Sequence, residues 1–332
     1  MEKVLTISIA AYNVEKFLSK TLDSLIINNM DLLEVLIVND GSKDNTVKIA
    51  QEYVDRYPQT FKIIDKENGG YGSTINSGIK AATGKYFKQL DGDDWYKTEN
   101  LDILCEKLKE CEEDVIYTPY VIYNEVDESE KIKDVFNGED FKSYLMEEAI
   151  EKVSNIIEMH SLIYKTELLR NNNIKIQEHC FYTDTEFAIY PLLYAENVKY
   201  INTCIYVYRV GREGQSMSKE GKKKHYKDHI TVGNNILAKY KQTDFNNQPN
   251  MRTYIKKFLA KFLASGIGNY FFLFEPSKEK FQEIQEYDEN ILKMDKEIYN
   301  DMSQYSKMVN VIRKKNYFAY KMAYYLKKLK RF

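Results

Sequence analysis

The sequence predicts an α/β protein: a mostly parallel sheet with helices on both faces, followed by a helical C-terminal extension. Apolar runs of strand length alternate with longer mixed segments through about the first hundred residues, the pattern of a parallel sheet covered by helices. From about residue 219, the apolar residues recur at helical spacing instead. The length of 332 residues suits about two domains of roughly 150 residues each. We therefore expect a sheet domain over 1–215 and a helical region over 216–332.

Strands and helices are expected to alternate along the start of the sheet domain. Apolar residues of segment 14–27 share one helical face, and Asp44 or Asn45 can cap a helix that ends near Tyr57. Gly84 ends another helix. The expected elements in chain order are strand 4–10, helix 14–27, strand 35–38, helix 45–57, strand 61–64, helix 73–82, strand 86–90, helix 98–109 and strand 115–123.

The remaining chain is less regular before it becomes helical. Residues 124–140 are acidic and predict a surface hairpin or loop, and 141–210 mixes helices with a strand-like stretch over 198–210. Helices are expected over 223–240 and 252–274, with a break at Pro276 and charged helices beyond it.

Composition excludes several classes of protein. A net charge of −2 argues against a nucleic-acid binder, which needs a basic surface to neutralise phosphates. The four cysteines lack zinc-site spacing, so reduced and mostly buried thiols are expected. The N-terminus leads directly into a strand and resembles no signal peptide, and no apolar stretch approaches 18 residues. We expect a cytoplasmic protein.

The C-terminal segment 313–332 is basic and aromatic. It holds eight lysines and arginines and no acidic residue, interleaved with tyrosine, phenylalanine, methionine and leucine. Such a segment suits an anionic membrane surface, which predicts peripheral contact with the inner leaflet. The alternative is a helix that packs its tyrosines on the rest of the domain.

Polar residues follow each of the first four expected strands. Ligands of an open parallel sheet bind beyond the carboxyl ends of its strands, so these residues are expected to share one cleft. They are Ala11-Tyr12-Asn13, Asn39-Asp40-Gly41-Ser42, Glu67-Asn68-Gly69-Gly70 and Asp91-Gly92-Asp93-Asp94. Neither a dinucleotide fingerprint after the first strand nor a P-loop is present.

Asp91 and Asp93 are the clearest candidates for metal ligands. Two residues apart on an extended segment, they project to the same side, and their oxygens suit Mg²⁺ or Mn²⁺. Such a cation would neutralise charge that develops on a departing diphosphate. The alternative is a solvated turn in which Asp94 caps the next helix.

With these residues in view, the N-terminal half resembles family 2 glycosyltransferases. The motifs that carry the resemblance span about residues 4–96 in the family's order and spacing. They are Ala10-Ala11-Tyr12-Asn13, Asn39-Asp40-Gly41-Ser42, Asn68-Gly69-Gly70, Asn76-x-Gly78, Ala82-Thr83-Gly84 and Asp91-Gly92-Asp93-Asp94. The resemblance implies a GT-A fold, with a donor half over about 1–96 and an acceptor half over about 97–215.

The resemblance also implies roles for individual residues. Phe181 to Phe187 is similar to the family's E-D-x-x-F, which makes Asp184 the catalytic base, with Glu186 as the competing candidate. Asp93 would hold the metal, Asp91 the ribose or the metal, and Asp40 the nucleobase. The full set of implied donor-binding residues is Ala11, Tyr12, Asn13, Asp40, Asn68, Gly69, Asn76, Asp91, Gly92, Arg209, Arg212 and Ser216.

One position departs from the family pattern. Ile75 stands where members often carry an arginine that contacts phosphate. Lys88, Arg209 or Arg212 could supply that contact, because a guanidinium matches phosphate oxygens and lysine supplies a point charge.

These expectations define one function and two alternatives. The expected enzyme is an inverting glycosyltransferase that uses Mn²⁺ or Mg²⁺ to move a sugar from a nucleotide-diphosphate donor, expected to be a UDP-sugar. The acceptor would be a glycan or lipid-linked hydroxyl in cell-surface polysaccharide synthesis. The alternatives are a sugar-phosphate nucleotidyltransferase, whose glycine-rich loop would have to follow the first strand, and a catalytically silent binding module.

Overall fold

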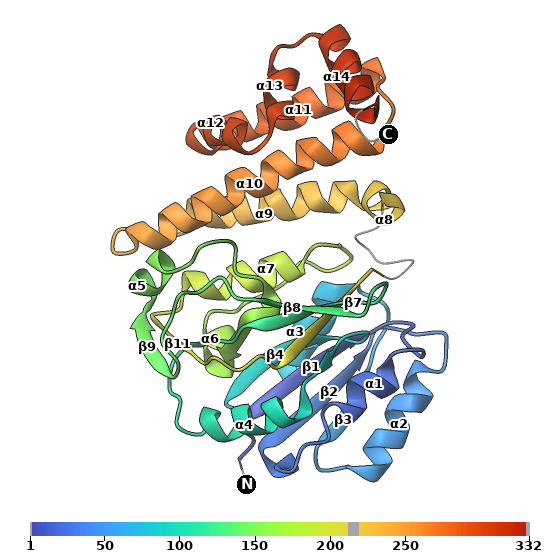
Figure 1. Cartoon of the computed structure of the whole chain (residues 1–332), viewed down its shortest axis with the longest axis vertical. Coiled ribbons are helices and arrows are strands. Elements are labelled where there is room, and N and C mark those ends of the chain that lie inside the picture. The colour runs from blue at the N-terminus through green and yellow to red at the C-terminus, as the bar shows by residue number, and fades with distance from the viewer. Residues whose placement is uncertain (1, 212–218, 330–332) are drawn as a thin grey trace. The chain divides into compact units, whose positions relative to one another are not determined.

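The computed structural model describes residues 2–211 and 219–329, apart from the side chains of Tyr270, Phe272 and Lys327. The chain forms two compact units, Met1–Arg212 and Glu213–Phe332 (Figure 1). The boundary expected at 215/216 lies within 212–218, outside the described residues, and stays a prediction.

The first unit is built on an eight-stranded sheet in the order β3-β2-β1-β4-β10-β6-β11-β9. Its strands are β1 (Leu5–Ala11), β2 (Leu33–Asn39), β3 (Phe61–Asp65), β4 (Tyr86–Asp91), β6 (Val115–Tyr117), β9 (Lys142–Leu145), β10 (Leu162–Lys165) and β11 (Asn197–Tyr200). Strands β9 and β10 run antiparallel to their neighbours, while the neighbouring pairs among β1, β2, β3 and β4 are parallel. The predicted mostly parallel sheet is therefore confirmed.

Helices cover both faces of this sheet, because successive side chains of a strand point to opposite faces. Leu5, Ile7 and Ile9 of β1 are fully buried in a core shared with α1 (Leu18–Asp23), α2 (Thr46–Arg56) and α4 (Thr98–Leu108). On the other face, α3 (Tyr71–Ala81) lies so close that a Cβ on Gly78 would be 2.2 Å from the Ser8 hydroxyl oxygen. Small polar side chains on β1 thus permit the approach of α3.

Several expected elements differ from those observed. The helix expected over 14–27 is the shorter α1 (Leu18–Asp23). The strand expected over 115–123 divides into β6 and β7 (Tyr120–Asn124), which belong to different sheets. Likewise, the stretch 198–210 divides into β11 and β12 (Tyr206–Val210). Within the stretch 124–140, expected as a surface hairpin or loop, β8 (Ser129–Lys133) forms a hairpin with β7, which begins earlier, at Tyr120.

The second sheet and the remaining short helices complete the first unit. The sheet has the order β5-β12-β7-β8, where β5 is Trp95–Tyr96. The other helices are η1 (Met30–Leu32), α5 (Met146–Glu151), η2 (Met159–Ser161), α6 (Thr166–Asn171), α7 (Asp184–Ile189) and η3 (Pro191–Leu193).

The second unit is helical, as predicted. Its helices are α8 (Lys219–Lys224), α9 (Tyr226–Gln242), α10 (Pro249–Leu273), α11 (Lys278–Met294), α12 (Lys296–Tyr305), α13 (Lys307–Arg313) and α14 (Tyr317–Leu329). Ser277, Asp295 and Ser306 accept hydrogen bonds from the first turns of α11, α12 and α13, so each break in the chain coincides with an N-cap. Across the described ranges, none of the helices has both the length and the apolar composition to cross a membrane.

Candidate active site

The carboxyl ends of the central strands bring the predicted donor residues to one edge of the sheet. Ala11 is in register with Asn39, and Ala10 with Asp91, so the segments after β1, β2 and β4 begin side by side. Tyr12 follows β1 and is 52% exposed, while Asn13 accepts a hydrogen bond from the Lys43 backbone N–H at 2.8 Å. The first two predicted segments therefore meet, with an exposed aromatic ring beside them.

Asp40 organises the glycine-rich turn after β3. Its buried carboxylate accepts hydrogen bonds from the backbone N–H groups of Gly69 and Gly70, each at 2.8 Å, and forms an ion pair with Lys66 at 2.7 Å. Asn68 donates to the Asp40 carbonyl at 2.9 Å. Asp40 thus fixes the turn that begins α3, and its predicted contact with a nucleobase stays a prediction.

The start of α3 packs closely against the segment 176–179. Gly70 has a φ of 80°, in the left-handed region that favours glycine, and a Cβ on Gly72 would lie 2.0 Å from the Gln177 carbonyl oxygen. Asn76 exchanges two hydrogen bonds of 2.9 Å with the backbone of Ile176. The Asn76 side chain therefore holds this segment in place, and its predicted donor contact is untested.

Asp91 and Asp94 occupy different environments in the turn after β4. Half-buried Asp91 accepts a hydrogen bond of 2.5 Å from the Tyr71 hydroxyl. Asp94 is fully buried and accepts hydrogen bonds from the Tyr206 hydroxyl at 2.7 Å and the Arg209 N–H at 2.8 Å. It does not cap α4, which begins at Thr98 after Lys97, so the alternative of a solvated capping turn is wrong. Gly92, between them, approaches the Ala10 carbonyl too closely to tolerate a side chain.

The turn places carboxylates close enough to compete for a proton. Burial, followed by repulsion from Asp91 and Asp93, raises the pKa of Asp94 well above its usual value. Burial and the neighbouring Asp91 raise the pKa of the Tyr71 hydroxyl in the same way. A cation at this position would relieve the repulsion.

His160 places an imidazole nitrogen next to the carboxylates of Asp91 and Asp94. It lies in η2, is buried, and stacks on Tyr208 with ring centroids 4.4 Å apart. Its Nδ1 atom has no hydrogen-bond partner among the described residues, although Glu158 lies 3.8 Å away. Lys88, fully buried, donates to the carbonyls of His160 and Leu162, at 2.8 and 3.2 Å. Lys88 therefore positions η2 and cannot reach a phosphate, so its expected role as a phosphate contact is wrong.

The residues present fit a divalent metal ion. One ligand atom from each of Asp91, Asp94 and His160 lies within 4.8 Å of the others. Two carboxylates and an imidazole form a donor set suited to a transition-metal ion such as Mn²⁺. Asp93, the predicted ligand, is half-buried, and its role as a ligand stays a prediction.

The two candidate bases are separated clearly by their surroundings. Glu186 is fully buried and accepts a hydrogen bond of 2.8 Å from the Gln177 N–H. Asp184 is half-buried at the first position of α7. Burial raises the pKa of its carboxyl above the ordinary value, and nearby His160 only partly offsets this increase. The Asp184 charge also acts on Tyr71, which contacts Asp91. Glu186 therefore holds the backbone at Gln177, and the role of Asp184 as the base stays a prediction.

Of the two arginines predicted at the donor site, the structure describes Arg209. It is buried, donates from Nε to the Asp93 carbonyl at 3.0 Å, and forms an ion pair with Glu125 at 3.1 Å. It therefore supports the backbone of the acidic turn, and its direct contact with a donor stays a prediction. Arg212 and Ser216 lie outside the described residues.

Sequence reasoning missed three members of this site. His160, Tyr71 and Tyr206 come from η2, α3 and β12, far apart in the chain, and none belongs to a quoted motif. The available signal was weak: His160 lies between Met159 and Leu162 in the sequence, which is equally typical of a core histidine. Only the antiparallel insertion of β10 between β4 and β6 places η2 beside the acidic turn.

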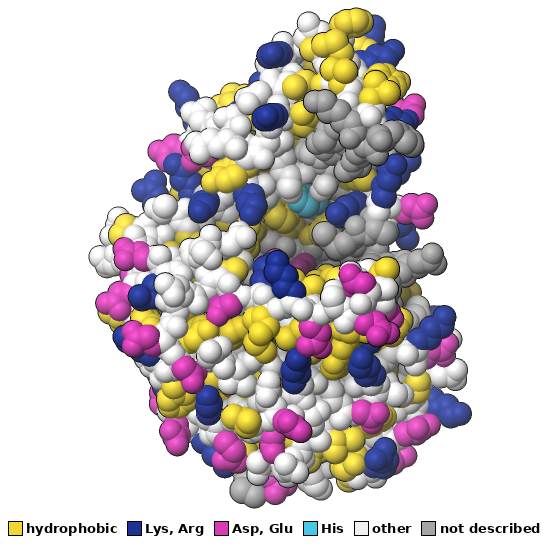
Figure 2. Space-filling view, in the orientation of Figure 1, with side chains coloured by type: hydrophobic (Ala, Val, Ile, Leu, Met, Phe, Trp, Pro, Cys, Tyr) yellow, Lys and Arg dark blue, Asp and Glu magenta, His cyan; other side chains and the backbone are white. Residues whose placement is uncertain are grey.

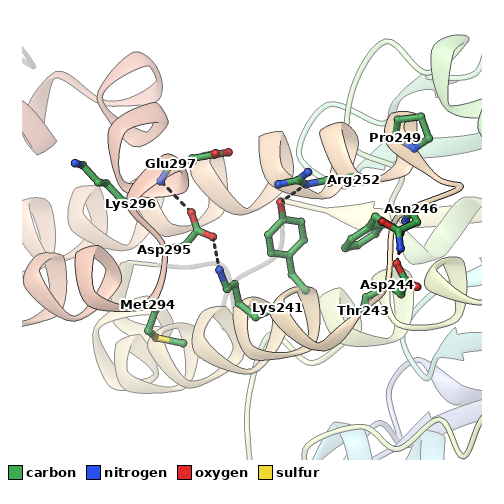
Figure 3. A pocket seen from close by; sticks show the side chains of 12 residues that line it. Lys241, Thr243, Asp244, Asn246, Pro249, Arg252, Met294, Asp295, Lys296 and Glu297 are labelled. Carbon is green, nitrogen blue, oxygen red and sulfur yellow. Dashed lines mark hydrogen bonds and ion pairs between the residues drawn. The ribbon is translucent and has the colours of Figure 1, made fainter.

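A separate cavity of about 650 Å³ lies within the second unit (Figure 3). Asp295 accepts hydrogen bonds from the first turn of α12 and pairs with Lys241 at 3.2 Å, while Arg252 donates to the Tyr240 hydroxyl. Acidic and basic side chains line it in equal number, so it offers no net charge to a ligand. We assign it no role in the chemistry below.

Comparison with known proteins agrees with this geometry. Residues 6–171 match the family described as Glycosyl transferase family 2. The putative glycosyltransferase EpsH of Bacillus subtilis is 29% identical over 213 residues, covering 61% of this chain and 59% of EpsH. The minor teichoic acid biosynthesis protein GgaB of Bacillus subtilis is 26% identical over 235 residues, covering 68% of this chain and 25% of GgaB. The chain thus spans less than two thirds of the length of these relatives.

Solved structures share the fold. S. aureus TarS 1–349 in complex with UDP-GlcNAc matches with a TM-score of 0.72 at 21% identity, covering 98% of this chain and 92% of that chain. The mannosyltransferase PcManGT from Pyrobaculum calidifontis, in complex with GDP-Man and Mn²⁺, matches with a TM-score of 0.50 at 13% identity, covering 95% and 87%. The fold is therefore the predicted GT-A fold, and the chain belongs to glycosyl transferase family 2.

Proposed function

We propose that this protein is an inverting, metal-dependent glycosyltransferase that moves a sugar from a UDP-sugar to a hydroxyl of a glycan or lipid-linked acceptor. The observation that carries the proposal is the meeting of Asp91, Asp94 and His160 at the carboxyl edge of the parallel strands. Asp184, half-buried, lies within electrostatic reach of His160. A cation-binding group and a candidate base thus share one edge.

The donor would bind along the segments that follow β1, β2 and β3. Exposed Tyr12 offers a ring on which a nucleobase can stack. Beside it, the Asp40 carboxylate holds the turn at Asn68 to Gly70 rigid, so the site is formed before the donor arrives. Preorganisation of this kind lowers the entropic cost of binding.

Asp91 and His160, together with Asp94 or neighbouring Asp93, would hold Mn²⁺ or Mg²⁺. When bound, such an ion supplies positive charge that stabilises the departing diphosphate. Tyr71 would orient Asp91 through the hydroxyl hydrogen bond, because contacts behind a ligand fix its direction. Arg209 would hold the backbone of the acidic turn through its hydrogen bond to the Asp93 carbonyl.

Asp184 would accept the proton of the acceptor hydroxyl. As that proton moves to the carboxylate, the acceptor oxygen forms a bond to the anomeric carbon and the bond from that carbon to the diphosphate oxygen breaks. Attack opposite the leaving group inverts the anomeric configuration. A carboxylate is effective here when its pKa lies below the working pH yet above that of a fully solvated acid, and burial shifts Asp184 in this direction.

The relatives support the choice of donor and process. TarS has been solved with UDP-GlcNAc and with UDP, and GgaB is described as a teichoic acid biosynthesis protein. We therefore place the reaction in cell-surface polysaccharide synthesis, with UDP-sugars as the first donors to test. PcManGT, which binds GDP-Man, makes GDP-sugars the second group.

A panel of nucleotide sugars tests this function. The purified protein should hydrolyse or transfer from at least one UDP-sugar in the presence of Mn²⁺, and chelation should abolish the reaction. The same donor with Mn²⁺ should raise the unfolding temperature, because a ligand that binds only the folded state stabilises it by mass action. Pyrophosphate release from a nucleoside triphosphate would instead support the nucleotidyltransferase alternative and contradict our proposal.

A further inference from the structure

The surface of α14 carries an exposed apolar stripe. Phe318 is 75% exposed and Leu329 is 71% exposed. Together with three other exposed residues they recur at the spacing of one helical face. The members of the stripe are Phe318, Met322, Tyr325, Leu326 and Leu329. Figure 2 shows hydrophobic side chains gathered in the part of the molecule that Figure 1 labels α14.

The opposite face of α14 fixes the helix to the rest of the second unit. Tyr320 is fully buried and packs against Phe271 of α10 and Phe281 of α11, with ring centroids 5.4 and 5.2 Å apart. Tyr317 donates to the Pro276 carbonyl at 3.2 Å. Tyr317 and Tyr320 thus belong to the packed face, whereas Tyr325 lies in the exposed stripe. The apolar stripe is therefore exposed although α14 is packed against α10 and α11.

Basic residues accompany the stripe. Lys321 and Lys328 lie on one flank of the helix, and Lys314 and Lys315 precede it, all four exposed. Lys315 and Lys328 pair with Glu289 and Glu275, whereas neither Lys314 nor Lys321 has an ion-pair partner in the part of the chain described. No acidic residue occurs in 313–332. The surface therefore combines exposed apolar groups with positive charge.

The second unit as a whole carries a net positive charge, like α14. Residues 213–332 contain 24 lysines and arginines against 13 aspartates and glutamates, although the complete chain has a net charge of −2. This excess of positive charge attracts an anionic partner through long-range electrostatic interaction. It also opposes pairing of two copies through α14, because a two-fold interface would place the same basic flank on both sides.

We infer that α14 is a membrane-docking helix whose apolar stripe inserts into the surface of an anionic lipid bilayer, with Lys314 and Lys321 at the level of the headgroups. Aromatic and leucine side chains with flanking lysines are the composition of helices that lie in a membrane interface. Neither charge nor apolar contact alone gives stable attachment, and this helix provides both. The inference is independent of the proposed chemistry.

Vesicle flotation tests the inference with the full chain. The protein should float with vesicles of phosphatidylcholine mixed with phosphatidylglycerol, and much less with phosphatidylcholine alone. The variant F318S/M322S/L326S should lower the lipid-bound to free ratio by at least about tenfold, since three inserted apolar side chains are lost. K314Q/K321Q should lower that ratio by about tenfold, and only on the anionic vesicles.

A matched control and a solution measurement make the outcome decisive. Ile103→Ser removes an exposed apolar side chain of α4 in the first unit and should leave flotation unchanged. All variants alter exposed residues, so their thermal unfolding should match the parent protein. Absence of flotation by the parent, or equal flotation by the triple variant, overturns the inference. Sedimentation velocity showing a dimer that the triple variant dissociates would assign the stripe to a second copy and also overturn it.

Discussion

The two units of this chain use charged residues in opposite ways. In residues 1–212, carboxylates outnumber basic groups, and several of them, such as Asp40 and Asp94, lie buried where backbone or tyrosine donors hold them. In residues 213–332, basic groups predominate, and α14 adds exposed apolar side chains. Buried acidic groups require partners and so mark a site built for chemistry, whereas an exposed basic and apolar surface marks attachment. We interpret the first unit as the catalytic part and the second as the docking part.

The largest effect expected from this comparison is the loss of the base. Asp184→Asn should lower kcat by about 10²–10⁴-fold, the usual contribution of a positioned general base, while donor affinity stays within about twofold. Transfer rates and the KM for the donor measure the two quantities. Unchanged transfer by the folded Asp184→Asn variant would contradict the base assignment and revive the silent binding module.

Glu186→Gln provides the matched control for that substitution. Because the Glu186 carboxylate is buried and accepts from the Gln177 N–H, its replacement should lower the free energy of unfolding by about 1–3 kcal/mol. Transfer per folded molecule should change far less than in Asp184→Asn. A larger kinetic loss at Glu186 than at Asp184 would exchange the two roles.

Metal ligands should give the next largest effect, confined to the first unit. Asp91→Asn and His160→Gln are expected to weaken Mn²⁺ binding more than about 100-fold, and Tyr71→Phe, behind Asp91, about 10–100-fold. Isothermal titration with Mn²⁺ and UDP measures this. His225→Gln, a histidine of the second unit paired with Asp228, is the control and should leave the affinity unchanged. An equal loss of Mn²⁺ affinity in His225→Gln would contradict the assignment of the metal site to the first unit.

The pH dependence of transfer should report the environment of Asp184. Burial raises the pKa of this carboxyl above its ordinary value, and a base must be deprotonated to act. Activity should therefore fall as the pH decreases through the raised pKa, at a pH above that of a solvated aspartate. The acid limb of kcat against pH measures it. A limb at or below about pH 4, the value for an unperturbed aspartate, would mean that Asp184 is not the titrating base.

The last prediction concerns the stability of the second unit and no effect on transfer is expected from it. His229, stacked on Phe262 with centroids 4.0 Å apart, is buried, and burial lowers its pKa from 6.5 to about 4. Folding favours the neutral ring, so its contribution is intact above pH 6.5 and is lost as the pH falls towards 4, by about 3 kcal/mol in total. His229→Gln should flatten this dependence in denaturant titrations at both pH values. An unchanged slope would show that His229 does not titrate on unfolding.

Much of the fold could be predicted because its signals are local. Apolar runs at strand and helix length, together with turn residues such as Gly84, are enough to predict the parallel strands and the helical second unit. The prediction of a single strand over 115–123 and over 198–210 was wrong. In each stretch the chain passes from the eight-stranded sheet to the four-stranded sheet and forms a strand in both. The local sequence of an apolar run does not determine which of the two sheets its residues join. The charged sequence around His229 likewise predicts a surface position, whereas the structure buries this ring, since helical spacing alone does not give the direction of burial.

The site was predictable where motifs supply consecutive residues. Asp40, Asp91 and the glycine-rich turn follow parallel strands, so the strand order alone brings them together. His160 and Tyr206 could not be found in this way, because they reach the acidic turn through β10 and β12, whose pairing is set by long-range contacts. The burial of Lys88 and Asp94 was missed for the same reason.

The central claim is that one metal ion and one nucleotide bind at the acidic turn after β4. A crystal grown with UDP and Mn²⁺ tests this directly through the anomalous scattering of manganese. We expect a single strong peak bonded to Asp91 and within reach of His160, with the UDP diphosphate on it and the nucleobase beside Tyr12. A peak remote from Asp91, or UDP bound elsewhere with no manganese at the turn, would contradict the account.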